Sequence, residues 1–276
     1  MNQGGVENFI MNFYRKIDKS QIQLDFLVNR EGYFDDEIKK MGGKIYYVPA
    51  LQKVGQIKYQ KNLDKFFRKH REYKIVHSHL NQVTGLILER AKKANIPVRI
   101  AHSHNSKSPK NIIIKCYKNY LGNKIFNNAN VYFACSKLAA DWLFKKNSEK
   151  AIIINNAIDV DKFIYDQEKR KNIRQKLNII NDETMLIGHV GRFNKQKNHQ
   201  FLLKVFKELS NKKNNCMLLL IGEGKLKNKI IKLIHKYGLE NKVKLLGTRK
   251  DVNDILQGID ILLFPSLYER ITSNPY

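Results

Sequence analysis

The stretch that decides the fold is Gly188-His189-Val190-Gly191-Arg192-Phe193-Asn194-Lys195-Gln196-Lys197-Asn198-His199. An apolar strand ends here in glycine, and Arg192 and Lys197 precede a segment with helical periodicity. The N-terminus of a helix presents unpaired N–H groups and a positive dipole, so two cations beside it predict a diphosphate site. The alternative is a loop with two solvated basic residues, because lysine is abundant throughout the chain.

Further strand ends in this half of the chain carry similar turns. They are Ile221-Gly222-Glu223-Gly224, Leu245-Leu246-Gly247-Thr248-Arg249 with Asp251, and Phe264-Pro265-Ser266-Leu267-Tyr268-Glu269. A single Gly-x-Gly is a weak signal, because it usually marks only a tight turn. Together with the first stretch, however, every motif lies at the carboxyl edge of one predicted sheet, where open α/β folds bind their ligands.

Short β-rich runs alternate with helix-period segments along the whole chain, which predicts an α/β protein with mostly parallel strands. The predicted strands cover residues 22–28, 44–48, 74–79, 98–103, 130–135, 151–155, 185–190, 217–221, 243–246 and 259–264. Two helical stripes are expected to face a sheet. One consists of Phe9, Phe13 and Ile17 with Ile10 and Tyr14 beside them, and the other of Val83, Leu86, Ile87 and Ala91. The charged stretch 166–171 is typical of a surface connection, so we expect domains at 1–165 and 166–276.

Length and composition agree with two globular domains. The chain has 276 residues, of which 42% are hydrophobic and 10% aromatic, enough for packed cores. It has no apolar run long enough to span a membrane, and its first residues lack the pattern of a signal peptide. We therefore expect a chain that neither spans a membrane nor is exported.

The cysteines indicate the cellular compartment, and the charge indicates the kind of binding partner. Cys116, Cys135 and Cys216 are odd in number and lack metal-ligand spacing, which favours free thiols in the cytoplasm. The net charge of +26 suggests a nucleic-acid or anionic-membrane partner. Because the excess is spread over both halves of the chain, we expect no nucleic-acid face.

The ordered set of motifs in the second half resembles the donor-binding half of glycosyltransferase family 4, which has the GT-B fold. The first half agrees, since Gly4-Gly5-Val6-Glu7 looks like the family's glycine turn before its first helix. Val76-His77-Ser78-His79 and Ala101-His102-Ser103-His104-Asn105 look like strand ends of the acceptor side. Asn155-Asn156-Ala157-Ile158-Asp159 resembles the segment before the domain crossing. The resemblance implies two Rossmann-like domains facing across a cleft.

The resemblance also implies roles for residues of the second half. Arg192 and Lys197 would hold the diphosphate of a nucleotide sugar, with Gly222 and Gly224 in the same donor site. The loop of Thr248 and Arg249 would lie near the base. In addition, Glu269 would contact the sugar hydroxyls and take part in catalysis.

In the first half, Gly4 and Gly5 would pack near the phosphates, and His102 or His104 would line the point of transfer. His79 and Asn105 would belong to the acceptor side. The implied activity is transfer of a sugar to a growing cell-surface polysaccharide or lipid-linked acceptor, with retention and without a metal or cofactor. The similar bacterial enzymes build capsular or exopolysaccharide repeat units.

A segment at residues 110–124 predicts contact with a membrane. Lysines at 110, 115, 118 and 124 flank Ile112, Ile113, Ile114, Tyr117 and Leu121 in a basic amphipathic helix. We expect peripheral binding to anionic lipid on the inner face of the cell membrane. The alternative is an apolar face packed in the core, with its lysines in water.

Two other readings of the polar motifs remain open. The pairs His77-x-His79 and His102-x-His104 resemble four metal ligands of a metal-dependent hydrolase, which would also need carboxylate partners. Histidines that simply end strands with satisfied hydrogen bonds are the plain alternative. Asp159-Val160-Asp161 is a nominal metal-binding Asp-x-Asp, but its position suits a turn between domains better.

The sequence departs from the family at both ends, so a truncated chain is expected. A Rossmann half opens with a strand before its glycine turn, and here that first strand is missing. Without it, the strands at 22–28 and 74–79 would lack a shared neighbour. After Glu269 the family's second glutamate has no counterpart. The competing hypothesis is therefore an inactive remnant that at most binds nucleotide.

Overall fold

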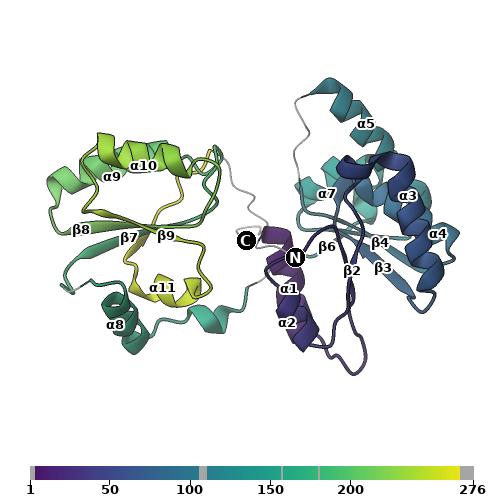
Figure 1. Ribbon diagram of the computed structural model, residues 1–276, viewed down its shortest axis with the longest axis horizontal. Coiled ribbons are helices and arrows are strands. Elements are labelled where there is room, and N and C mark those ends of the chain that lie inside the picture. The colour runs from purple at the N-terminus through teal and green to yellow at the C-terminus, as the bar shows by residue number, and fades with distance from the viewer. Residues whose placement is uncertain (1–3, 106–110, 157, 180, 268–276) are drawn as a thin grey trace. The chain divides into compact units, whose positions relative to one another are not determined.

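The computed structural model describes residues 4–105, 111–156, 158–179 and 181–267. The described chain forms two compact units, the first ending at Ile158 and the second beginning at Asp159. Helices alternate with parallel strands in both units (Figure 1), which confirms the predicted α/β class. The Asn155–Asp159 segment lies where one unit gives way to the next, as its resemblance implied.

The strands of the first unit form a pair and a separate sheet. They are β1 (Phe26–Val28), β2 (Ile45–Tyr47), β3 (Ile75–Ser78), β4 (Val98–Ser103), β5 (Val131–Ala134) and β6 (Ile152–Ile153). β1 pairs with β2 in parallel, and the larger sheet has the parallel order β3-β4-β5-β6. Among the described residues, the strands within 22–28 and 74–79 share no neighbour.

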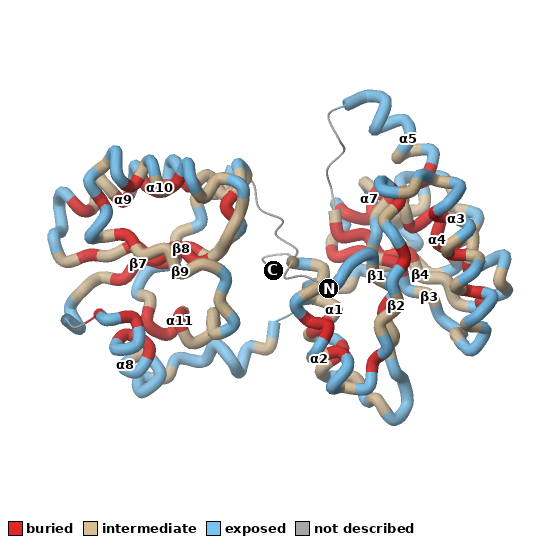
Figure 2. Tube along the Cα trace, viewed as in Figure 1, coloured by how far each residue is buried: buried red, intermediate tan, exposed pale blue. Residues whose placement is uncertain are grey.

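Helices cover these strands and bury apolar faces against them. They are α1 (Gly5–Lys16), α2 (Asp35–Lys40), α3 (Leu51–Lys69), α4 (Thr84–Lys93), α5 (Ile112–Asn123), α6 (Ile125–Asn128) and α7 (Lys137–Phe144), with short 3₁₀ turns at Asn81–Val83 and Lys145–Lys150. Leu86, Ile87 and Ala91 of α4 are buried among α3 side chains, as the helical spacing indicated. Burial is therefore concentrated between helices and sheet (Figure 2).

The predicted buried stripe of α1 is confirmed in part. Tyr14 is fully buried, and Ile10 and Ile17 pack against the same core, whereas Phe13 is 56% exposed and Met11 is buried as well. Tyr14 stacks edge-on against Phe26 of β1, and its hydroxyl donates a hydrogen bond to the Met41 carbonyl at 3.2 Å. The buried face therefore includes Met11 and leaves Phe13 outside.

The second unit is one parallel sheet with helices on both faces. Its strands are β7 (Met185–Val190), β8 (Cys216–Ile221), β9 (Val243–Gly247) and β10 (Ile261–Leu262), in the order β10-β7-β8-β9. Its helices are α8 (Gln167–Lys176), α9 (His199–Lys212), α10 (Lys227–Lys236) and α11 (Val252–Gly258), with a 3₁₀ turn at Val160–Phe163. α9 and α10 lie on one face and α8 and α11 on the other (Figure 1).

The apolar run of β8 explains this double layer. Leu218 and Leu220 pack into the core under α9 and α10, while Leu219 and Ile221 pack into the core with α8 and α11. Successive side chains of a strand point to opposite faces, so a continuous apolar run suits a sheet buried on both sides. The carboxyl ends of these strands thereby meet at one edge.

The second unit begins earlier in the chain than the charged stretch 166–171 suggested. The Gln257 side chain of α11 donates to the Ile164 carbonyl at 3.0 Å and accepts from the Asp166 N–H at 3.0 Å. These two bonds tie residues 164–166 to α11. The second unit therefore begins before the expected boundary at residue 165.

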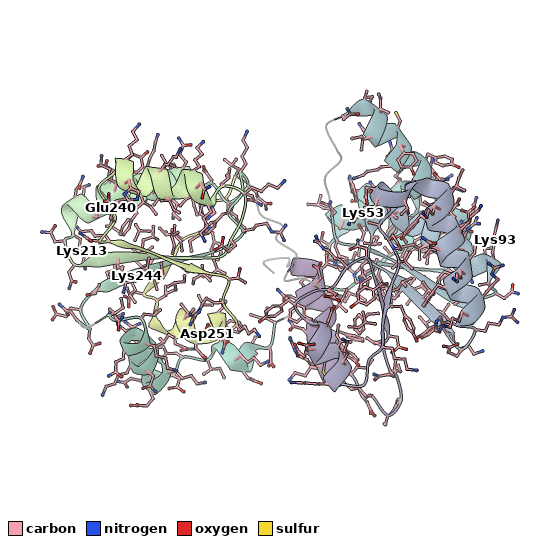
Figure 3. All side chains as sticks on the ribbon, in the orientation of Figure 1. Lys53, Lys93, Lys213, Glu240, Lys244 and Asp251 are labelled. Carbon is pink, nitrogen blue, oxygen red and sulfur yellow. The ribbon has the colours of Figure 1, made fainter. Side chains whose placement is uncertain are left out.

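Charged side chains project from the helices and loops of both units (Figure 3). The labelled Lys53 and Lys93 belong to helices of the first unit, and Lys213 and Lys244 belong to the second. Lys244 also stabilises the fold, because its ammonium group donates a hydrogen bond to the Leu177 carbonyl at 2.6 Å. This agrees with a dispersed basic excess.

Candidate active site

The loops that follow β7, β8 and β9 are joined through their backbones. The Gly191 N–H donates to the Ile221 carbonyl at 2.9 Å, and the Gly222 N–H donates to the Gly247 carbonyl at 2.8 Å. The Phe193 N–H donates to the Glu223 carbonyl at 2.9 Å. The sequence motifs of the second half thus form one continuous carboxyl edge.

Two glycines permit this close approach. A Cβ on Gly222, whose φ is +136°, would lie 2.2 Å from the Gly191 carbonyl oxygen. A Cβ on Gly224 would lie 2.4 Å from the Phe193 carbonyl oxygen. Gly222 and Gly224 therefore let the loop after β8 lie directly against the loop after β7, which carries the cations. These glycines thus stabilise the packing of the loops, in addition to any contact with a donor.

Arg192 and Lys197 lie on that first loop, next to the start of α9. The Lys197 N–H donates to Asn194 Oδ1 at 3.1 Å, and the Lys197 Cδ and Cε methylenes lie beside Gly191. Arg192 is exposed, and among the described residues it makes no ion pair or side-chain hydrogen bond. A guanidinium without a protein partner beside a helix N-terminus can bind an anion.

In the loop after β9, unlike the loop after β7, the arginine has an ion-pair partner. Arg249 forms a two-point ion pair with Asp251, with Nε–Oδ1 at 2.8 Å and Nη2–Oδ2 at 2.6 Å. That hydrogen bonding raises the pKa of Arg249 and lowers that of Asp251. The charge of Arg249 is thus already balanced, whereas Thr248 is exposed at the loop surface. Glu269 lies outside the described residues.

His199 is a residue of this edge that sequence reasoning missed. It opens α9, is 2% exposed, and its ring stacks edge-on against His189 and Phe193 at 4.8 Å from each. Burial, with smaller contributions from His189 and Lys197, lowers the pKa of His199 to about 4. Its only sequence signal was its place directly after Lys197 and Asn198.

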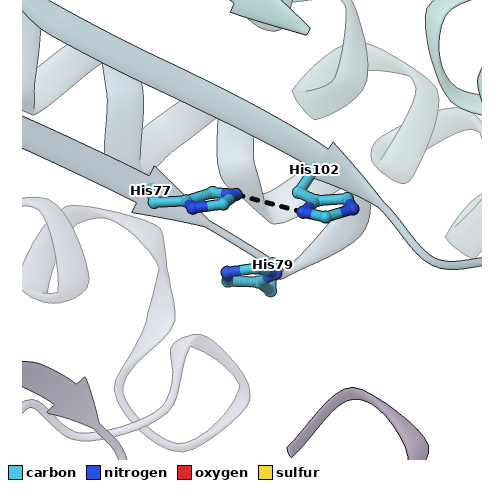
Figure 4. Close-up of side chains that lie close together, drawn as sticks. All are labelled: His77, His79 and His102. Atoms are coloured by element: carbon cyan, nitrogen blue, oxygen red, sulfur yellow. Dashed lines mark hydrogen bonds between the residues drawn. The ribbon is translucent and has the colours of Figure 1, made fainter. Parts of the chain in front are cut away.

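In the first unit, the predicted histidines converge at the ends of β3 and β4 (Figure 4). His77 Nε2 lies 3.1 Å from His102 Nδ1, and His79 Nδ1 lies 2.8 Å from His104 Nε2. Ser78 pairs with Ala101, so His79 is level with His102. Residues two apart point to the same side of a strand, which places these imidazoles in one ladder.

The start of α1 covers this histidine ladder. The Phe9 ring lies edge-on to His102 at 5.3 Å and to His104 at 5.4 Å. Gly4 is the N-cap of α1 and Gly5 its first residue, so the glycine turn begins the helix that carries Phe9. Asn105 follows His104 directly.

Burial sets the protonation of the ladder. His102 is fully buried, and burial together with repulsion from His104 and His77 lowers its pKa to about 2. Burial likewise lowers the pKa of His79 well below its usual value. At neutral pH these rings are uncharged, so each offers one N–H and one lone pair.

Family models match both halves of the chain. The model described as Glycosyltransferase Family 4 matches residues 3–162, and the model described as Glycosyl transferases group 1 matches residues 157–275. A Bacillus subtilis protein named as the glycosyltransferase EpsF is 33% identical over 278 residues, covering 98% of this chain and 72% of that protein.

Two further relatives have more specific names. The capsular polysaccharide biosynthesis glycosyltransferase CapH of Staphylococcus aureus is 27% identical, covering 98% of this chain and 74% of CapH. An Escherichia coli UDP-Gal:alpha-D-GlcNAc-diphosphoundecaprenol alpha-1,3-galactosyltransferase is 24% identical, covering 96% of this chain and 71% of that enzyme.

Among solved structures, Anabaena HepE in complex with UDP and glucose superposes with a TM-score of 0.78 at 18% identity. The match covers 95% of this chain and 71% of HepE. At this identity the likeness shows the fold, which is GT-B. Within the described residues, every helix is too short or too polar to cross a bilayer.

The contact at Gly222 yields a test with a matched control. Gly222→Ala and Gly238→Ala each put a side chain on a residue with positive φ. At Gly238, with φ +65°, this costs about 1–2 kcal/mol, and at Gly222, with φ +136°, at least about as much. Space around Gly238 is open, whereas Gly222 faces the Gly191 carbonyl. Gly222→Ala should therefore lose a further 1–3 kcal/mol or so of unfolding free energy in urea denaturation. Equal losses in the two variants would contradict the close loop contact.

The buried His199 predicts a pH dependence. Its pKa is about 4 in the folded chain and about 6.5 when unfolded, so the unfolded state binds more protons between these values. Stability is complete above pH 6.5 and falls below it, by about 2 kcal/mol between pH 7 and pH 5 from this group. His199→Phe should remove that part of the loss in urea denaturation, while His235→Gln, on an exposed side chain, should not. An unchanged pH profile in His199→Phe would exclude a neutral buried imidazole.

Proposed function

The chain belongs to glycosyltransferase family 4, and we propose that it transfers a sugar from a nucleotide-sugar donor to a growing cell-surface polysaccharide or lipid-linked acceptor. The observation that carries this proposal is that Arg192 and Lys197 lie in the loop that leads from β7 to the first residue of α9, at the carboxyl edge of the second unit. The names of the Staphylococcus and Escherichia relatives support the acceptor class.

A diphosphate suits this edge for electrostatic reasons. The first N–H groups of α9 lack partners within the helix and point toward its N-terminal side. Arg192 has its donors available, and a guanidinium can bind two phosphate oxygens at once. Lys197 supplies a second cation from the same loop.

The same groups would assist the reaction. When the bond between the sugar carbon and the diphosphate oxygen breaks, negative charge grows on the leaving diphosphate and positive charge on the sugar ring. Cations held in place before the reaction stabilise that leaving group without reorganising. We therefore propose that the donor is cleaved without a metal ion, and, from the family resemblance, with retention of configuration at the sugar carbon.

The first unit would supply the acceptor side. In the proposal, His102 or His104 lines the point of transfer, and the neutral imidazoles hydrogen-bond to sugar hydroxyls rather than attract phosphate as cations. His79, Asn105, Gly4 and Gly5 complete this edge. Glu269 would contact the donor sugar, and Thr248 and Arg249 the base.

We also propose that the chain lies in the cytoplasm and binds the inner face of the cell membrane through α5. The first turns of this helix are exposed (Figure 2), with Ile112 at 66% and Ile113 at 75%. Its contact with the body of the unit is made near Leu121 and Gly122, which are buried. The alternative of a core-packed apolar face does not fit these exposures.

Cations accompany the exposed apolar residues. Lys115 and Lys118 lie on α5 between Ile114 and Tyr120, which is 53% exposed. Lys124 is held by Glu89 at 3.0 Å, so it contributes less to a membrane contact than the sequence suggested. Lys110 lies outside the described residues. Apolar side chains beside lysines that form no ion pair within the described part of the chain suit an interface of anionic lipid.

The donor site is tested by removing each cation. Arg192→Ala and Lys197→Ala should each raise the Kd for UDP about 10- to 100-fold, because each loses a charge-assisted hydrogen bond of about 1.5–3 kcal/mol. Lys195→Ala, an exposed lysine of the same loop, is the control and should bind normally. Titration calorimetry measures all three. In an assay of sugar transfer, the same two variants should lower kcat about 10²- to 10³-fold.

Unchanged UDP affinity in both folded variants would overturn the donor assignment. Normal UDP binding by the unaltered chain, with no release of sugar from a panel of nucleotide sugars, would instead support the binding-only alternative.

The membrane contact is tested by flotation with liposomes that contain anionic lipid. Ile113→Glu should reduce binding at least about tenfold, since it puts a charge into the apolar contact and repels anionic lipid. Phe201→Glu, at a 53% exposed position of α9, should leave binding unchanged. Equal retention of the two variants, or no retention of the unaltered chain at low salt, would refute the role of α5.

A further inference from the structure

We propose that His77, His79 and His102 bind one divalent transition-metal ion of the zinc class, with His104 as the residue that orients His79. The ligand nitrogens of these three histidines lie within 4.8 Å of one another. They come from neighbouring strand ends, so an ion bound here would join β3 to β4. His79 and His102 also belong to the proposed acceptor edge, so this site overlaps that edge, although the proposed sugar transfer itself requires no metal.

The closest contact of the ladder brings two possible ligand atoms together. His77 Nε2 and His102 Nδ1 are 3.1 Å apart, a distance at which one ring donates its N–H to the other. An ion bound between these two nitrogens would replace that proton and use one lone pair of each ring.

The spacing suits a small tetrahedral ion after a modest side-chain movement. Zinc–nitrogen bonds of about 2.0–2.1 Å place two ligand nitrogens roughly 3.4 Å apart in a tetrahedron. The His77–His102 pair is already near that value, and His79 has to approach it from within 4.8 Å. Figure 4 shows the three rings gathered at the ends of the two strands.

His104 fits the role of an outer partner. Its Nε2 lies 2.8 Å from His79 Nδ1, which leaves His79 Nε2 for the ion. Metal-binding histidines usually hydrogen-bond through their other nitrogen, and that bond fixes the tautomer and the ring direction. Phe9 covers His102 and His104 and limits the access of water.

The donor set defines the class of ion. Neutral imidazoles favour Zn²⁺, Co²⁺, Ni²⁺ and Cu²⁺, whereas Mg²⁺ and Ca²⁺ require oxygen ligands. The group of three contains no carboxylate, so it lacks the acidic partners that the hydrolase reading required. The ion is therefore proposed as a tie between strands, with its fourth position left to water or an anion.

The experiment is a titration of the chelator-treated chain with Zn²⁺ and Co²⁺. We expect one equivalent to bind with a Kd of about 10 μM or tighter, visible Co²⁺ bands of tetrahedral coordination, and a higher midpoint of thermal unfolding. His77→Phe and His102→Phe should each weaken binding at least about 100-fold. His104→Phe should weaken it about 10- to 100-fold as an outer partner.

His235→Gln removes an exposed histidine paired with Glu240 and serves as the control for surface binding. It should leave the affinity unchanged, and circular dichroism should show each variant folded. The Co²⁺ spectrum of the unaltered chain gives an answer even if a variant fails to fold. The proposal is overturned by a Kd above about 1 mM, by an octahedral oxygen-type spectrum, or by equal affinity in folded His102→Phe.

Discussion

The carboxyl edge of the second unit depends on a backbone contact that glycine alone permits. Gly222 lies so close to the Gly191 carbonyl that a Cβ would overlap with it. Because of this contact, the loops after β7 and β8 share hydrogen bonds, and the loop that carries Arg192 is held against the sheet edge.

The sequence predicted the strands well because buried parallel strands are continuous apolar runs between turn residues. It predicted only part of the buried face of α1, for a physical reason. Phe9, Ile10, Met11, Phe13 and Tyr14 are all apolar, so periodicity alone defines no single face. The choice of Met11 and Tyr14 depends on Phe26 and Met41, which are distant in sequence.

In the candidate sites, too, some features follow from the local sequence and others depend on tertiary packing. The positions of Arg192 and Lys197 follow from local strand-to-helix order, which the sequence contains. The pairing of Arg249 with Asp251, the burial of His199 and the register that stacks His79 with His102 depend on how loops and strands pack. The spacing of the histidines was visible, but whether they meet was not.

In the proposed function, the carboxyl edge of the second unit binds the nucleotide diphosphate. Amide chemical shifts of the isotope-labelled chain, followed during a titration with UDP, locate the binding site residue by residue. The largest saturable shifts should occur at residues 191–199 and 222–224, including the first turn of α9. Shifts that are confined to the first unit or to the opposite edge of the second sheet, with none at these residues, would contradict it.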